Sequence, residues 1–221
     1  ISHEIRNPLG IIGSTAQLLY QKTEEGDQKK KLGKIIMEET TRLNSIVTDF
    51  LDFARPTTPH LSECQVDKVL EKNLEFLEVE LKRRDITVEK RFAENGTPVY
   101  ADGDLLYRAF LNIFVNAMEA LDDGGTIKVV TSYQYAQKDS LEVVISDTGA
   151  GISQETLAKI FDPFFTTRET GTGLGLPIVR NIIESHGGTI QIESPPRKER
   201  AQMEDRGTAI IISLPVNPVV S

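Results

Sequence analysis

The amino-acid sequence predicts an N-terminal all-α helical hairpin, which pairs with a second copy to form a dimeric four-helix bundle, followed by an α+β sandwich. Two patterns support this prediction. Residues 5–53 carry apolar side chains three and four positions apart. Beyond residue 64, short alternating strands and amphipathic helices mix without the regular alternation of a doubly wound sheet. We therefore expect a hairpin at 1–55, a linker at 56–64 and the sandwich at 65–221.

Composition narrows the class of protein. The 221 residues are 39% hydrophobic and 26% charged, which is typical of ordinary soluble globular domains. The longest apolar runs fall far short of the roughly 20 residues that a membrane helix needs. A net charge of −8 disfavours binding to a nucleic-acid backbone. The single cysteine, Cys64, cannot form an intrachain disulfide, which favours a reducing, cytoplasmic location.

The chain starts at Ile1 without an initiator methionine or a signal-type segment. We interpret it as a piece of a longer protein. The nature of the region before Ile1, including a membrane anchor there, stays open.

The first helix of the hairpin is predicted from an apolar seam with alternating spacings of four and three. A turn-prone stretch, 23–27, separates it from a second seam over 32–53. The second helix should end before Pro56, because the residue preceding a proline avoids helical geometry. Two helices leave apolar surface uncovered, and a four-helix bundle closes it, so we expect a homodimer. The first seam consists of Ile5, Leu9, Ile12, Ala16 and Leu19.

The sandwich elements follow from amphipathic periodicity and from strand-like alternation. A charged segment without periodicity, 195–206, is predicted to be a loop. The expected helices are 66–84, 104–121 and 174–186, and the expected strands are 86–92, 126–132, 141–147, 189–193 and 208–214.

His3 is the first candidate reactive group. Helical phase places it about 160° from the first seam and about 40° from Asn7, so its imidazole should point to solvent. Neutral imidazole is a good nucleophile near neutral pH, and the adjacent carboxylate of Glu4 can accept its other ring proton. The alternative is an ordinary solvated helix face.

Two further clusters lie in the sandwich. Asn112 and Asn116 stand four residues apart on the polar face of a predicted helix, and an amide oxygen is an adequate Mg²⁺ ligand. Asp147 follows a predicted strand, where a buried carboxylate can accept a hydrogen bond from an exocyclic amine. Gly149 and Gly151 allow close backbone approach to a flat ligand. The alternatives are surface polarity and a tight turn.

The fourth cluster, 171–175, reads Gly-Thr-Gly-Leu-Gly and opens a predicted helix, so it is an expected anion site. No apolar strand precedes it and the spacing is G-x-G-x-G, which argues against a dinucleotide fold. The sequence also lacks the Gly-Lys-Ser/Thr of a P-loop.

These four clusters, taken in order, resemble the motifs of the sensor histidine kinases of two-component systems. Residues 3–8 reproduce the family pattern His-Glu-x-x-Asn-Pro, 112–120 resemble its N box, and 161–168 resemble its F box and the start of its ATP lid. The resemblance covers essentially the whole chain. Residues 51–56 and the phrase Gly-Leu-Pro-Ile-Val look most like the nitrogen-regulation, NtrB-like branch.

The resemblance implies a HisKA dimerisation and phosphoacceptor hairpin, then an ATP-binding sandwich of the Bergerat (GHKL) type shared with gyrase and the ninety-kilodalton heat-shock chaperones. ATP·Mg²⁺ would phosphorylate His3 with Glu4 as base, and the phosphoryl group would pass to an aspartate of a response-regulator receiver domain. Asn116 would hold Mg²⁺, Asp147 would read the adenine amine, and Asn7 would support phosphatase activity toward the regulator. The implied ATP-binding residues are Asn112, Asn116, Asp147, Gly149, Gly151, Arg168, Gly171, Thr172, Gly173, Leu174 and Gly175.

Two rival functions fit the sequence less well. Gyrase-type and chaperone-type ATPases carry a hydrolytic Glu one helical turn before the Mg²⁺ ligand, whereas this chain has Asn112 there. A pseudokinase that only dimerises has no use for Asn116, Asp147 and the glycines. Arg168 and Glu119 stand where the family often has Lys, and of these only Arg168 keeps the charge for a phosphate contact. The handedness of the 23–27 turn, which decides between cis and trans phosphorylation, is left open, as are the sensed signal and the cognate regulator.

Overall fold

The computed structural model describes residues 2–24, 27–54, 58–93, 98–121, 124–134, 139–168, 171–196 and 206–217. The chain divides into two compact units. The first comprises Ile1–Pro56 together with Thr166–Leu174, and the second comprises Thr57–Phe165 together with Gly175–Ser221. Most of the charged loop expected at 195–206 and part of the turn expected at 23–27 fall outside the described residues.

The first unit contains a pair of long helices, α1 (Ser2–Lys22) and α2 (Gln28–Ala54). Small residues let them approach closely: a Cβ on Gly33 would stand 3.3 Å from the carbonyl oxygen of Ala16. The carboxylate of Asp27 accepts the N–H of Lys29 at 2.9 Å and thereby caps the start of α2. Both helices lie within the predicted hairpin, 1–55.

The hairpin leaves much of its apolar surface uncovered within one chain. Ile11, on α1, is 68% exposed and Leu32, on α2, is 52% exposed. Large apolar side chains exposed in this number on two packed helices indicate an interaction surface. The other large apolar residues exposed on the two helices are Ile12, Leu18, Leu19, Ile35, Ile36, Leu43 and Phe50.

The second unit is built on a five-stranded mixed sheet, in which the strand order is β2-β4-β5-β7-β6. β2 pairs with β4 in parallel, and the remaining neighbours are antiparallel. The strands are β2 (Ile86–Arg91), β4 (Gly125–Gln134), β5 (Ser140–Asp147), β6 (Thr189–Glu193) and β7 (Thr208–Pro215). Every strand predicted from the sequence is present in this sheet.

A second, two-stranded sheet was not anticipated. β1 (Ser62–Cys64) pairs antiparallel with β3 (Val99–Ala101). The last three residues of the stretch predicted as a linker, 56–64, therefore pair with a strand of the second unit instead of only joining two parts.

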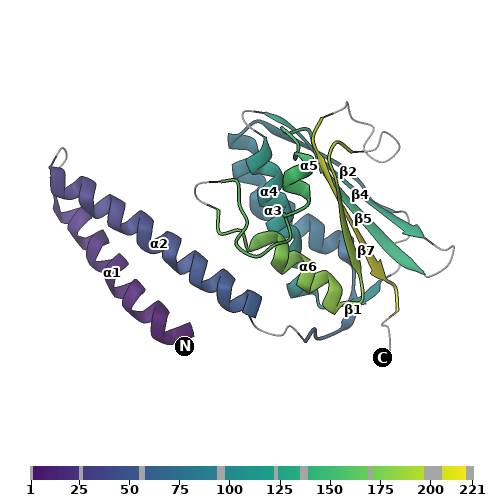
Figure 1. The fold of residues 1–221 in the computed structure, drawn as a ribbon, viewed down its shortest axis with the longest axis horizontal. Helices are drawn as coiled ribbons and strands as arrows, with labels where there is room; N and C mark the ends of the chain where they lie inside the picture. Colours follow the sequence, from purple (N-terminus) through teal and green to yellow (C-terminus); the bar gives the residue numbers. More distant parts are fainter. Residues whose placement is uncertain are drawn as a thin grey trace. The chain divides into compact units, whose positions relative to one another are not determined.

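Helices cover one face of the large sheet (Figure 1): α3 (Val66–Arg83), α4 (Gly103–Ala120) and α6 (Gly175–Ser185). A short helix, α5 (Gln154–Leu157), was missed by the sequence analysis. The core lies between these helices and the sheet, where alternate strand residues are buried. Fully or almost fully buried members are Phe110, Phe114, Ile127, Val129, Val143, Ile182, Ile183 and Ile212.

Helix α4 is held firmly at its start. The Asp102 carboxylate accepts the N–H groups of Asp104 and Leu105, each at 3.1 Å. Partial burial alone would raise the pKa of Asp102, but backbone donors including His60 outweigh it, so this pKa lies below its usual range. The N–H of Asp102 donates in turn to Nε2 of the buried His186 at 2.9 Å, which ties α4 to the end of α6.

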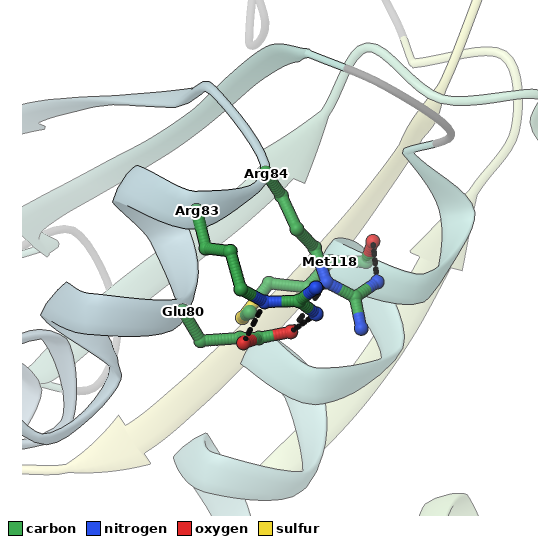
Figure 2. Close-up of polar contacts among 4 residues, drawn as sticks. All are labelled: Glu80, Arg83, Arg84 and Met118. Atoms are coloured by element: carbon green, nitrogen blue, oxygen red, sulfur yellow. Dashed lines mark hydrogen bonds and ion pairs between the residues drawn. The ribbon is translucent and has the colours of Figure 1, made fainter.

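The far end of α4 is joined to α3 by an arginine (Figure 2). Arg84 Nε donates to Glu80 at 2.7 Å, and its Nη1 lies 3.4 Å from the carbonyl oxygen of Met118. Hydrogen bonds from Arg83 and then from Arg84 lower the pKa of Glu80 to about 2. Both ends of α4 are thus fixed by neighbouring segments of the second unit.

Candidate functional site

Helix α4 supplies the two candidate amides. Asn112 is half-buried, and its Nδ2 donates to the carbonyl of Arg108 at 3.1 Å. Its Oδ1 faces the first residue of α6, since a Cβ on Gly175 would stand 3.5 Å from that oxygen. Asn116 lies one helical turn further along and is also half-buried. The structure therefore brings Gly175, the last glycine of the fourth cluster, beside the helix of the second cluster.

Asp147 ends β5 and is 5% exposed. Its Oδ1 accepts the N–H of Gly149 at 2.8 Å, which closes the turn that follows the strand. β4 supports the same turn, because Thr148 and Thr126 exchange two hydrogen bonds of 3.0 and 3.1 Å. The predicted carboxylate is therefore buried and orientated by its own turn.

The turn after Asp147 rests directly on the C-terminal end of α4. The N–H of Ala150 donates to the carbonyl of Ala120 at 3.3 Å. A Cβ on Gly149 would stand only 2.4 Å from that carbonyl oxygen, so a side chain does not fit there. The third predicted cluster is thus joined by backbone contact to the helix that carries the second.

Residues 166–168 and 171–174 belong to the first unit, and two threonines organise their backbone. Thr166 Oγ1 accepts the N–H of Arg168 at 3.1 Å, and a Cβ on Gly171 would stand 2.5 Å from this oxygen. Thr172 Oγ1 donates to Asp49 of α2 at 3.0 Å and accepts the N–H of Leu174 at 3.3 Å. Residues 171–174 also include Gly173, at φ +67°, and the completely buried Leu174.

The N-terminal candidates lie in α1, which begins at Ser2. The side chains of His3, Glu4 and Asn7 fall outside the described residues, so their orientation stays a prediction. The backbone does carry one expected feature: Pro8 lies inside α1 and has no N–H to donate to the carbonyl of Glu4. One helical hydrogen bond is therefore missing beside His3.

Metal binding depends on which donor side chains the chain brings together. Among the described residues, no group of three or more His, Cys, Asp and Glu side chains could hold a metal ion. Mg²⁺ does not need such a cage when phosphate and water supply most of its oxygens. The amide of Asn116 fits that requirement, and its role as a ligand stays a prediction.

Two residues outside the four clusters touch the turn after Asp147. Gly207 has φ +99°, and a Cβ there would stand 1.9 Å from the carbonyl oxygen of Asp147. Ser194 hydrogen-bonds both Ile152 and Gly207. The sequence marks Gly207 only as a glycine before a strand, and a lone serine after a strand carries no spacing signal, so Ser194 was missed.

Among the described residues, no helix combines the length and the hydropathy needed to cross a membrane.

Comparison with known proteins identifies the family. Residues 101–218 match the family model described as "Histidine kinase-, DNA gyrase B-, and HSP90-like ATPase", and residues 1–59 match "His Kinase A (phospho-acceptor) domain". Sensor histidine kinase ZraS of Escherichia coli (strain K12) is 34% identical over 219 residues, which are 98% of this chain and 44% of the relative. The chain thus spans less than half the length of that relative.

Solved structures agree. Histidine kinase ThkA, in a crystal structure with the response regulator protein TrrA, matches with a TM-score of 0.72 and 28% identity, over 99% of this chain and 60% of that one. Full-length ShkA in complex with AMPPNP matches with a TM-score of 0.79 over 100% of this chain and 45% of that one, and at 23% identity this is a likeness of fold. The chain belongs to the histidine kinase family and carries its phospho-acceptor region followed by its ATP-binding domain.

Proposed function

We propose that the chain is the catalytic core of a sensor histidine kinase that transfers the γ-phosphoryl group of ATP to His3 and then to an aspartate of a response-regulator receiver domain. The observation that carries the proposal is the contact of the Gly149–Ala150 turn with the carbonyl of Ala120. This contact supports the proposal because it joins the turn after Asp147, the predicted base-reading residue, to the helix that carries Asn116, the predicted Mg²⁺ ligand. The same chain carries the phosphoacceptor motif at His3.

The proposed chemistry uses the groups that the family motifs assign. A ring nitrogen of His3 attacks the γ-phosphorus, the bond from that phosphorus to the bridging oxygen breaks, and ADP leaves. Glu4 accepts the proton from the other ring nitrogen as positive charge develops. Asn116 would hold the Mg²⁺ that accompanies ATP, and the ion would supply charge neutralisation, which together with positioning accounts for most phosphoryl-transfer catalysis.

Base recognition is assigned to Asp147. A carboxylate accepts several hydrogen bonds, so the bond from Gly149 is compatible with a further one from the adenine amine. Burial to 5% exposure strengthens that bond, because little water competes with it. Arg168, Gly171, Thr172, Gly173 and Leu174 are assigned to the phosphates, with Arg168 contributing positive charge.

Partners and location belong to the proposal as well. The exposed apolar residues of α1 and α2 support a homodimer in which two hairpins form a four-helix bundle. The complex of ThkA with TrrA supports a receiver domain as the second partner. Both ATP and receiver domains point to the cytoplasm, and the NtrB-like branch stays a prediction.

Incubating the purified chain with radiolabelled ATP tests the proposed function. We expect labelling that is labile in acid and stable in alkali, which distinguishes phosphohistidine from a phosphate ester. A chain that binds ATP but acquires no such label would contradict the proposed kinase activity.

Replacing Asp147 by Asn should weaken ATP binding about tenfold or more. An amide is a poorer acceptor and presents its own donors to the adenine amine, and a hydrogen bond to a charged group contributes roughly 1.5–3 kcal/mol. Calorimetric titration with ATP measures the loss, and circular dichroism checks the fold. Asp104→Asn, on the exposed first turn of α4, is the matched control. Wild-type affinity in a folded Asp147→Asn variant would remove this residue from the base site.

Asn7→Ala should lose phosphatase activity toward the phosphorylated receiver while keeping substantial kinase activity, and Glu4→Ala should do the reverse. An amide can orientate an attacking water without removing its proton, whereas autophosphorylation needs a base beside His3. Both rates are measured on both variants with one receiver, with the exposed Gln17→Ala of α1 as control. Parallel losses of the two activities in each variant would exclude this division of labour.

A further inference from the structure

A buried hydroxyl at the end of β6 joins three segments of the second unit that are distant in sequence. Ser194 is 7% exposed. Its O–H donates to the carbonyl of Gly207 at 2.8 Å, and its Oγ accepts the N–H of Ile152 at 2.7 Å. One side chain thus uses its donor and its acceptor on two different stretches of backbone.

The bond to Ile152 fixes the turn that follows Asp147. Ile152 comes directly after Gly151, which has φ +77°. A Cβ on Gly151 would stand 3.0 Å from Ser194 Oγ and 3.3 Å from the carbonyl oxygen of Gly207. The backbone of this turn therefore packs directly against the serine hydroxyl.

The bond to Gly207 fixes the opposite side of Asp147. Asp147 pairs with Thr208 in the β5–β7 register, next to Gly207. A Cβ on Gly207 would stand 1.9 Å from the carbonyl oxygen of Asp147, so these two backbones lie in close contact. Ser194 consequently holds both the turn that follows Asp147, through Ile152, and the backbone that contacts Asp147, through Gly207.

We infer that Ser194 is a positioning residue for nucleotide binding: it fixes the turn 147–152 in the conformation that presents the Asp147 carboxylate to the base. This inference rests on the proposed function, because it takes Asp147 as the group that reads the base. Ser194 acts through the backbone of Ile152 and Gly207, so its contribution falls at the base end of the nucleotide. The loss on removing it should therefore be equal for nucleotides that differ only in their phosphates.

Ser194→Ala leaves the Ile152 N–H and the Gly207 carbonyl without this partner. The turn then moves to satisfy them, and the affinity for ADP should fall about tenfold. The affinity for a non-hydrolysable ATP analogue should fall by the same factor. A residue that only stabilised the fold would lower the resistance to urea and leave the affinity of the folded protein unchanged.

The experiment measures ADP binding by calorimetry and unfolding by urea for the wild type and four variants. Ser194→Thr keeps the hydroxyl and should bind like the wild type. Ser194→Cys keeps a similar shape with weaker hydrogen bonding and should show a smaller loss of ADP affinity. It replaces the alanine variant in the experiment if that variant does not fold. Thr131→Val is the matched control, because Thr131 is a buried hydroxyl in β4 that accepts the N–H of Ala93 at 2.9 Å. It should lower stability without changing the ADP affinity.

Amide exchange of Ile152, measured without nucleotide, separates this inference from the proposed function. Faster exchange at Ile152 in Ser194→Ala, together with the loss of ADP affinity, supports the inference. If Ser194→Ala and Thr131→Val both lose stability yet both bind ADP like the wild type, the inference is overturned. A wild type that does not bind ADP contradicts the proposed function. In that case the amide exchange rate of Ile152 tests the inference, and an unchanged rate in Ser194→Ala overturns it.

Discussion

Replacing His3 by Gln should abolish ATP-dependent phosphorylation of the chain while leaving ATP affinity almost unchanged. Glutamine has a similar reach, but its amide nitrogen has no lone pair available for attack on phosphorus. The Asp147 turn and α4 lie in the second compact unit, whereas His3 lies in the first. The substitution should therefore remove the proposed acceptor without disturbing the proposed base site.

The chain supplies a matched control for this variant. It contains three histidines, and His186 is buried, whereas His60 is exposed. His60→Gln should label like the wild type. Labelling is measured with radiolabelled ATP, and binding is measured separately by calorimetry. Wild-type labelling of His3→Gln, or loss of labelling in His60→Gln, would show that His3 is not the acceptor.

Gly149→Ala should reduce ATP affinity by about 100-fold, because overpacking a close contact costs up to about 3 kcal/mol. The new Cβ would stand 2.4 Å from the carbonyl oxygen of Ala120, and both partners are backbone and cannot rotate away. The turn carrying Asp147 must then separate from the end of α4. The proposed base-reading carboxylate and the helix of Asn116, the proposed Mg²⁺ ligand, are then no longer held together.

Gly103→Ala is the control for this substitution. Gly103 begins the same helix, and its Cβ would meet only Cys64 Sγ at 3.6 Å, an ordinary contact. ATP titration of both variants, with circular dichroism for folding, measures the effect. Equal affinities in the two alanine variants would mean that the contact of Gly149 with α4 does not shape the site.

The sequence predicts the elements with strong periodicity and misses those without it. Strand β6 has the predicted bounds, 189–193, and α4 differs by one residue at each end. β1 and β3 have three residues each, too few to display alternation, and each is defined by its partner strand. Tertiary pairing therefore decides where the expected linker ends.

The residues of the candidate site likewise divide into those that the sequence predicts and those that it does not. Gly149 and Gly151 could be identified from their spacing after a strand, because the need for a glycine is a local property of a turn. Ser194 could not, since its partner Ile152 lies 42 residues away and the contact exists only once β6 and β5 share a sheet. Nothing in the sequence distinguishes Ser194 from any other serine that follows a strand.

The hydrogen bond from Ser194 to Gly207 also bears on how the family can diversify. Donor and acceptor lie 13 residues apart along the chain, and β6 and β7 pair antiparallel on the sheet side of this bond. The bond closes the connection between β6 and β7 at its base, so the segment between Ser194 and Gly207 can lengthen or shorten while the bond is kept. Loop closure entropy grows slowly, by about 0.6 kcal/mol for each doubling of length. Natural insertions, or an engineered reporter domain, should therefore be tolerated between Ser194 and Gly207 without altering the turn that holds Asp147.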